Sequence, residues 1–292
     1  MSIYEKAYAK INLLLAVTGK RDDGYHQLET VYQSLALHDT LTFTKIKENN
    51  IILSCDHSGL PAAQDNLVWR AAERLKLLYE VKQGVHIRLE KRIPLAAGLA
   101  GGSSDAAATL RGLVRLWQLP WEEDVIFELA ARLGSDVPFC LRGGTALGTG
   151  RGEIITELPN CPPFYVVLAN PGFYVSTASV YAALQPDDFS GAYDLPGMLS
   201  ALKAKNHRQI ISHLTNMLEP AVFRIHPAVK TLKAKMNASG SALLCGSGPT
   251  VFALFNSRAE AEKLAQLLLH ERYKVWLTDT CQPHTGGGLP HD

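Results

Sequence analysis

The chain has 292 residues, of which 47% are hydrophobic and 20% charged, so it can bury the cores of two domains and is not a disordered protein. Its formal net charge of +1 argues against a dedicated nucleic-acid-binding protein. The five scattered cysteines form no C-x-x-C pair, which is typical of a reduced cytoplasmic protein. No apolar run reaches the roughly 20 residues that cross a bilayer, so we expect no membrane span.

The first half of the chain mixes strand-like runs with helical patterns. The predicted strands cover residues 11–18, 41–46, 50–55 and 84–93. Apolar residues at helical spacing predict helices over about 67–79 and about 122–133, the second ended by Gly134. A glycine-rich stretch and an amphipathic helix lie between these two helices.

The second half begins at a proline-rich segment, LPNCPPF at 158–164, which interrupts the periodic patterns and indicates a domain boundary. Beyond it we predict strands over 164–169, 241–246, 250–255 and 274–279, and helices within 198–235 and over 258–270. The irregular mixture of strands and helices favours an α+β fold over a doubly wound sheet. The predicted units are an N-terminal domain over 1–158, a C-terminal domain over 159–283 and a loose tail over 284–292.

The most informative stretch is PLAAGLAGGSSDAA, at 94–107. Its glycines let the backbone approach a ligand closely, and Ser103, Ser104 and Asp105 are expected to cap the helix that follows. Unpaired amides and the helix dipole favour a phosphate at such a terminus. The alternative, a glycine-rich turn with an ordinary cap, explains Gly102 and Ser103 but not the whole run.

Two common phosphate-binding motifs can be excluded. No G-x-x-x-x-G-K-[ST] run is present, which excludes a Walker A loop. A dinucleotide fingerprint needs an acidic residue at a strand end about 20 residues further on, whereas Glu122 and Glu123 open a predicted helix. An anion-binding loop in this stretch would therefore be of another kind, and the glycine-rich turn remains the alternative.

This loop resembles the phosphate loop of the GHMP kinase superfamily of small-molecule kinases. KAYAKINLLL at 6–15 and LLCGSGPTVFALF at 243–255 resemble the family's other two motifs, and the three occur in the family's order. The resemblance implies a two-domain fold, with a ribosomal-protein-like α+β N-terminal domain and a ferredoxin-like C-terminal domain. It also implies that ATP, carrying Mg²⁺, binds in the cleft between them.

Two further segments narrow the expected acceptor. RDDGYHQLETVYQSL at 21–35 and GSDVPFCLRGGTALGTGRGE at 134–153 resemble the branch that phosphorylates the 2-hydroxyl of a cytidine-diphosphate-linked methylerythritol, in the non-mevalonate isoprenoid precursor pathway. We expect a small-molecule substrate, no nucleic-acid or membrane partner, and a monomer or weak homodimer. A mevalonate- or homoserine-type kinase and a catalytically inactive nucleotide sensor remain as alternatives.

Lys10 and Asp136 are the candidate catalytic residues. Lys10 lies in an apolar strand, where a lysine must reach solvent or pair with a carboxylate. Asp136 is either a base or a turn residue, and Pro138 is expected to hold Val137 extended. The resemblance favours catalysis for both and places them side by side. Whether Asp136 removes the proton or orients the hydroxyl stays open, and no protein-side metal ligand can be assigned.

The resemblance also implies the binding residues. Those expected at ATP are Asn66, Lys91, Pro94, Ala96, Ala97, Gly98, Leu99, Ala100, Gly101, Gly102, Ser103 and Ser104. Those expected at the acceptor are Asn12, Tyr25, His26, Tyr32, Thr177 and Tyr181, with His26 at the cytosine edge and the tyrosines flanking the ring.

Two residues depart from the pattern of many relatives. Ala100 stands where a glycine is common, so the loop is expected to pass through it in an ordinary conformation. Asp105 stands where an asparagine is common, and its charge argues against a phosphate contact by that side chain.

Overall fold

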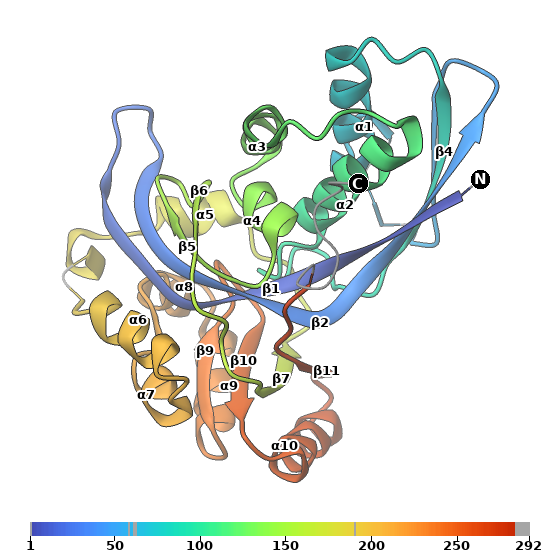
Figure 1. The fold of residues 1–292 in the computed structure, drawn as a ribbon. Coiled ribbons are helices and arrows are strands. Elements are labelled where there is room, and N and C mark those ends of the chain that lie inside the picture. Colours follow the sequence, from blue (N-terminus) through green and yellow to red (C-terminus); the bar gives the residue numbers. More distant parts are fainter. Residues whose placement is uncertain (1, 58, 61–62, 190, 284–292) are drawn as a thin grey trace.

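The computed structural model describes residues 2–57, 59–60, 63–189 and 191–283. The expected tail over 284–292 therefore lies outside the described residues. Figure 1 shows two sheets packed one above the other, with helices on their outer sides. Within the described residues, no helix has both the length and the apolar character that a bilayer crossing requires.

The N-terminal sheet is built around two long antiparallel strands, β1 (Ser2–Lys20) and β2 (His26–Ile46). The predicted strands over 11–18 and 41–46 are therefore parts of much longer ones, because the pairing continues through three register shifts and through mixed polar residues. The sheet order is β3-β4-β2-β1-β8, with β5 pairing β2 and β6. The shorter strands are β3 (Ile51–Cys55), β4 (Gly84–Glu90), β5 (Thr145–Thr149), β6 (Ile154–Glu157) and β8 (Thr215–Asn216).

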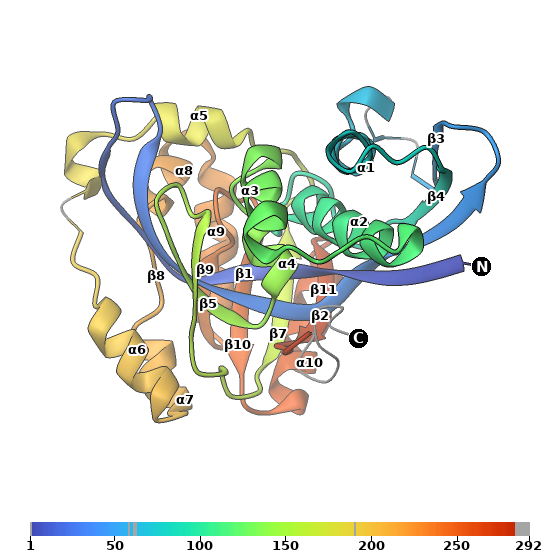
Figure 2. The ribbon, with the colours of Figure 1, turned by 45° about the horizontal axis from the view of Figure 1, so that its top comes forward.

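Helices cover one face of this sheet (Figure 2). They are α1 (Leu67–Leu78), α2 (Gly101–Trp117), α3 (Glu123–Leu133) and α4 (Val137–Arg142), preceded by the short helix η1 (Ala63–Asp65). Their apolar faces bury a core with Phe43, Leu75 and Leu110, in which each large side chain contributes about 1.5–3 kcal/mol. Gly134 follows α3 as expected, but its φ of 171° is extended.

The C-terminal sheet has the antiparallel order β11-β7-β10-β9. Its strands are β7 (Tyr165–Asn170), β9 (Ser241–Leu244), β10 (Val251–Phe255) and β11 (Lys274–Asp279). Numbered along the chain, this is a 4-1-3-2 order with helical crossovers, which is the expected ferredoxin-like arrangement. The helices are α5 (Thr177–Ala182), η2 (Pro186–Phe189), α6 (Leu195–Lys203), α7 (His207–Ser212), α8 (Glu219–Ile225), α9 (Pro227–Asn237) and α10 (Arg258–His270). The α+β class is confirmed.

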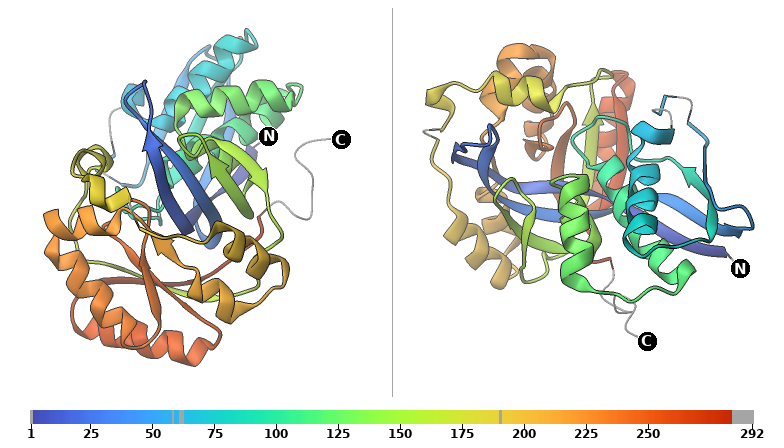
Figure 3. Two further views of the ribbon diagram at one scale, coloured as in Figure 1. Left: turned by 90° about the vertical axis from the view of Figure 1, so that its left-hand side faces the viewer. Right: turned by 90° about the horizontal axis from the view of Figure 1, so that it is seen from above.

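The two halves share a continuous contact through β1 and β2. β8 pairs parallel with β1, and the amide of Leu37 in β2 donates to Thr278 Oγ1 in β11 at 2.9 Å. A second core joins Ile11 of β1 to Phe252 of β10. Figure 3 shows β1 and β2 running between the N-terminal helices and the C-terminal half. Groups from both halves can therefore meet at β1, while the exact boundary near 158–164 stays a prediction.

Candidate active site

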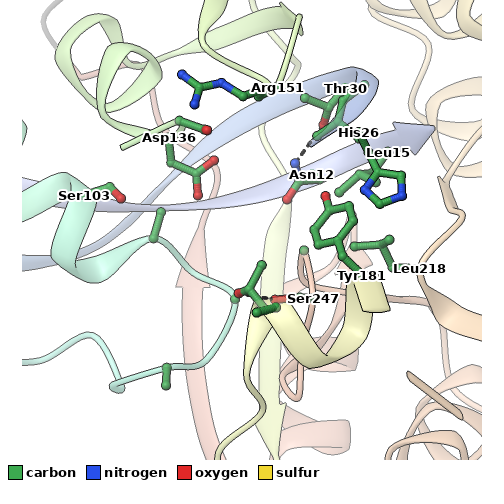
Figure 4. Close-up of a pocket in the computed structure, with 18 of the residues that line it drawn as sticks. Asn12, Leu15, His26, Thr30, Ser103, Asp136, Arg151, Tyr181, Leu218 and Ser247 are labelled. Carbon is green, nitrogen blue, oxygen red and sulfur yellow. Dashed lines mark hydrogen bonds between the residues drawn. The ribbon is translucent and has the colours of Figure 1, made fainter. Parts of the chain in front are cut away.

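A cavity of about 1460 Å³ lies along β1 and is lined by residues of both halves. The phosphate loop lies at one side, and His26, Tyr181 and Phe189 lie at the other. Figure 4 shows Ser103 and Asp136 on one side of this space and His26 with Tyr181 on the opposite side, with Asn12 between them. One continuous cavity therefore joins predicted nucleotide residues and predicted acceptor residues.

The phosphate loop, residues 94–102, leads into α2 through left-handed backbone positions. Ala96, Gly98 and Ala100 have φ values of 47°, 77° and 57°. Ala100 occupies the N-cap position, so the expectation of an ordinary conformation there is wrong. A non-glycine residue in this region is strained, and such strain persists only where the surrounding structure fixes the chain.

The expected serine caps are also wrong. α2 begins at Gly101, so Ser103 and Ser104 already lie inside the helix, and its N-cap makes no side-chain hydrogen bond. Ser104 Oγ instead donates to the carbonyl oxygen of Tyr8 at 2.7 Å, which ties α2 to β1. Without a side-chain cap, the first amides of α2 stay available to an anion.

Gly98 lines the cavity and also has a structural purpose that was not expected. A Cβ at this position would collide with the carbonyl oxygen of Cys245, in the turn between β9 and β10. The close approach that glycine permits here is between the two halves of the protein. Gly101 and Gly102 line the cavity, as do Gly246 and Ser247 of the opposite turn.

Lys10 and Asp136 meet at the centre of the cavity wall. Lys10 Nζ lies 3.5 Å from Asp136 Oδ2, and the side chain of Lys10 is only 5% exposed. Nζ also donates to Asn12 Oδ1 at 2.9 Å, and Asn12 Nδ2 donates to Thr30 Oγ1 at 2.7 Å. The backbone amide of Lys10 donates to Leu99 O of the phosphate loop at 3.1 Å. The buried cation thus has its carboxylate, and the strand that carries it is fixed to the loop.

Asp136 is placed by α4. It occupies the N-cap position, with Val137 and Pro138 as the first helical residues. The expectation that Pro138 holds Val137 extended is wrong, because proline at the second helical position needs no amide hydrogen bond and fits the first turn. Asp136 is partly exposed to the cavity, with a side chain that is 31% exposed.

Tyr32 supports Asp136 from a buried position, with only 2% of its surface exposed. Its hydroxyl donates to Asp136 Oδ1 at 3.0 Å, and its ring stacks on Phe139 with 4.6 Å between centroids. Burial and the neighbouring Asp136 charge raise the pKa of Tyr32 well above its ordinary value, so the hydroxyl remains a donor. The structure therefore places Tyr32 directly behind the carboxylate, and its expected place beside the cytosine stays a prediction.

The opposite end of the cavity is aromatic. The ring of His26 stacks on Tyr181, with 5.1 Å between centroids, and on Phe189, with 6.0 Å. Burial, with a smaller effect from Lys20, lowers the pKa of His26 and favours the neutral imidazole. Tyr25 is 54% exposed, and the Arg151 guanidinium lies 4.8 Å from its ring centroid.

Several lining residues were missed in the sequence. Phe189 belongs to η2, far along the chain from His26, and no local pattern marks it. Ser247 exchanges a hydrogen bond of 2.9 Å with Thr177, which was expected at the acceptor. Arg151 and Ser247 lie inside the motif segments GTGRGE and CGSGPT, and this position in the motifs is the sequence feature that could have identified them as lining residues.

The structure brings most predicted residues to the cavity but not all of them. Those that line it are Lys10, Asn12, Tyr25, His26, Tyr32, Pro94, Ala96, Ala97, Gly98, Ala100, Gly101, Gly102, Ser103, Asp136, Thr177 and Tyr181. Asn66, Lys91, Leu99 and Ser104 are absent from its lining, and Asn66 caps α1 through the amide of Val68. Among the described residues, no group of three or more His, Cys, Asp or Glu side chains could hold a metal ion.

Comparisons with known proteins agree with this geometry. Residues 66–144 match the GHMP kinases N terminal domain, and residues 198–274 match the GHMP kinases C terminal domain. The chain is 46% identical over 266 residues to a 4-diphosphocytidyl-2-C-methyl-D-erythritol kinase of Bacillus subtilis, covering 90% of this chain and 92% of that one. Its identity to the same kinase of Exiguobacterium sibiricum is also 46%, covering 90% and 93%.

A solved structure gives the same result in three dimensions. The crystal structure of a 4-(cytidine 5'-diphospho)-2C-methyl-D-erythritol kinase superposes with a TM-score of 0.82 at 36% identity, covering 95% of this chain and 99% of that one. Sequence, domain order and fold thus agree. The chain belongs to the GHMP kinase family, within its branch of 4-diphosphocytidyl-2-C-methyl-D-erythritol kinases.

Proposed function

We propose that the protein transfers the γ-phosphoryl group of ATP to the 2-hydroxyl of 4-diphosphocytidyl-2-C-methyl-D-erythritol. The observation that carries this proposal is the single cavity that holds the phosphate loop, the Lys10–Asp136 pair and an aromatic end. The relatives' names supply the acceptor. The other predicted properties, a cytoplasmic location and a monomeric or weakly dimeric state, accompany this proposal as expectations.

ATP binds with its phosphates at the start of α2. The loop fits such a group because its helix begins without a side-chain cap, and because Gly101, Gly102 and Ser103 line the cavity there. Mg²⁺ arrives with the triphosphate and offsets its charge. Lys10 adds a fixed positive charge at the cavity wall, near the point where the transferred group must pass.

The transfer step follows from the positions of Lys10 and Asp136. A bond forms between the acceptor oxygen and the γ-phosphorus, the bond from that phosphorus to the β-bridging oxygen breaks, and ADP leaves. The hydroxyl proton passes toward Asp136, which Tyr32 and Lys10 hold in one orientation. Lys10 stabilises the negative charge that develops on the acceptor oxygen.

The aromatic end receives the cytidine part of the acceptor. A neutral imidazole can both donate and accept a hydrogen bond, which suits a base edge. Tyr181, Phe189 and the exposed Tyr25 provide flat surfaces around His26. A small aliphatic acceptor such as mevalonate or homoserine has no aromatic base that could stack on these rings or bond to the imidazole.

The proposal is tested by measuring ADP release with four acceptors, each with and without EDTA. We expect EDTA-sensitive turnover with 4-diphosphocytidyl-2-C-methyl-D-erythritol and little with mevalonate, homoserine or galactose. Turnover with mevalonate or homoserine alone would assign another GHMP activity. ATP binding without ADP release for any of the four acceptors would support the catalytically inactive nucleotide sensor.

A further inference from the structure

Lys91 lies between two carboxylates under the phosphate loop. Its Nζ contacts Asp105 Oδ2 of α2 at 2.7 Å and also Asp39 Oδ2 of β2. The side chains of all three residues are at most 3% exposed, and none of them lines the cavity. The ammonium group therefore bonds two buried carboxyl groups and lies outside the lining of the cavity.

This buried cluster, defined as Asp39, Lys91 and Asp105, holds the entrance of the loop. Asp39 Oδ1 accepts hydrogen bonds from the backbone amides of Arg92 and Ile93, the second at 2.8 Å. These residues immediately precede Pro94, where the loop begins. Because one carboxylate oxygen takes both amides, the direction in which the chain enters the loop is fixed by a buried side chain.

The cluster also holds the exit of the loop. Asp105 lies in the second turn of α2, so its contact with Lys91 connects the helix to the chain that enters the loop. A Cβ at Gly101 would lie 3.3 Å from Lys91 Nζ, so the ammonium group lies directly behind the first helical residue. The chain that enters the phosphate loop and the helix that leaves it are thus both linked to the Lys91 ammonium group. The loop between them has strained backbone positions at Ala96 and Ala100.

We infer that Asp39, Lys91 and Asp105 are positioning residues that hold the phosphate loop in the conformation that receives ATP. The inference deepens the proposed function and rests on it. The amides at the start of α2 bind an anion only if the loop directs them into the cavity, and small displacements of positioned groups are costly. The cluster fixes the chain on both sides of Ala96 and Ala100, which lets these two alanines keep their left-handed backbone conformation.

The test measures the affinity for a nonhydrolysable Mg-ATP analogue by calorimetry, with KM for ATP and for the acceptor beside it. In Asp39→Asn, the amide oxygen can still accept from Arg92 and Ile93, but its NH₂ group faces the Lys91 ammonium. We expect nucleotide affinity to fall about tenfold, KM for ATP to rise in parallel, and KM for the acceptor to stay unchanged. A variant that is merely less stable, but folded during the assay, would keep its nucleotide affinity.

The matched control is Asp56→Asn. Asp56 is exposed and accepts a hydrogen bond from the backbone amide of Lys91 at 3.0 Å, a bond that asparagine can also make, so wild-type affinity is expected.

A second variant covers the case in which Asp39→Asn does not fold. Asp39→Asn/Lys91→Met removes the repulsion between the new amide group and the ammonium group, and it also removes the contact between Lys91 and Asp105. The same tenfold loss of nucleotide affinity is expected. Wild-type nucleotide affinity in either folded variant would overturn this inference alone. Absence of nucleotide binding in the wild-type protein would overturn the proposed function with it.

Discussion

The hydroxyl of Tyr32 donates to Oδ1 of Asp136 at 3.0 Å, while the other carboxylate oxygen lies 3.5 Å from Lys10 Nζ. A phenol and an ammonium group thus hold the two oxygens of one carboxylate at the cavity wall. The arrangement fixes the direction in which Asp136 can accept a proton. Because Tyr32 and Lys10 contact different oxygens, substituting one of them at a time distinguishes their roles.

Asp136→Asn removes the proton acceptor and retains the shape of the side chain. We expect kcat to fall by about 10²- to 10⁴-fold, the usual contribution of a positioned base. Nucleotide affinity should remain near that of the wild type, because the phosphate loop lies on α2 and not on α4. Steady-state kinetics and nucleotide titration check this pair of results. A variant that keeps most of its turnover would remove Asp136 from the chemical step.

Tyr32→Phe removes one hydrogen bond to Asp136 and leaves the ring stacked on Phe139. We expect kcat to fall about tenfold with little change in either KM, because a bond to a charged group contributes about 1.5–3 kcal/mol and acts here through orientation. Tyr79→Phe is the matched control, since the hydroxyl of Tyr79 donates to Glu122 at 3.3 Å at an exposed position outside the cavity. Equal rates in the two variants would contradict the role given to Tyr32.

Phe189→Ala removes one of the two aromatic rings that stack on His26. We expect KM for the cytidylyl acceptor to rise about tenfold while kcat and KM for ATP change little, because the loss concerns stacking at the end opposite the phosphate loop. His26→Ala should have the same direction of effect. Phe173→Ala, which removes a ring packed on His226 instead, serves as the comparison. An unchanged acceptor KM in Phe189→Ala would place the base elsewhere.

The outline of this site could be predicted from the sequence because its chemistry lies in short local motifs. Lys10, Gly101 and Asp136 each belong to such a segment, and a lysine in an apolar strand must either reach solvent or pair with a carboxylate. The contact of Phe189 with His26 could not be predicted, because it joins distant segments and depends on how the two halves pack.

Errors arose where tertiary contacts override local preference. Ala100 adopts a positive φ against its own preference, because the chain on both sides of it is held. Lys91 was expected at the nucleotide because the family resemblance placed it there, whereas the structure keeps it out of the cavity lining. The deciding partner, Asp39, comes from β2, and no local pattern connects it to Lys91.

Asp105→Asn should change the pH dependence of stability. Burial, opposed by Lys91 and reinforced by Asp39, raises the pKa of Asp105 to about 8. The unfolded chain has an ordinary aspartate pKa of about 3.9, so the native state binds more protons between these two values. The free energy of unfolding of the wild type must therefore fall as pH rises through this window. Asparagine cannot ionise, and its amide oxygen can still accept from Lys91.

The expected result is a stability difference between variant and wild type that grows with pH, and not a uniform shift. At pH 5 Asp105 is protonated in the folded protein but already ionised in the unfolded chain, so the variant should be the more stable by about 1.5 kcal/mol. At pH 8 the advantage of the variant should be larger by up to about 4 kcal/mol, since three pH units separate the two conditions and each corresponds to about 1.4 kcal/mol. Urea unfolding at both pH values measures the difference, and Asp56→Asn corrects for the general effect of losing a carboxylate. An equal difference between variant and wild type at the two pH values would show that Asp105 is ionised throughout, with Lys91 balancing its charge in the folded protein.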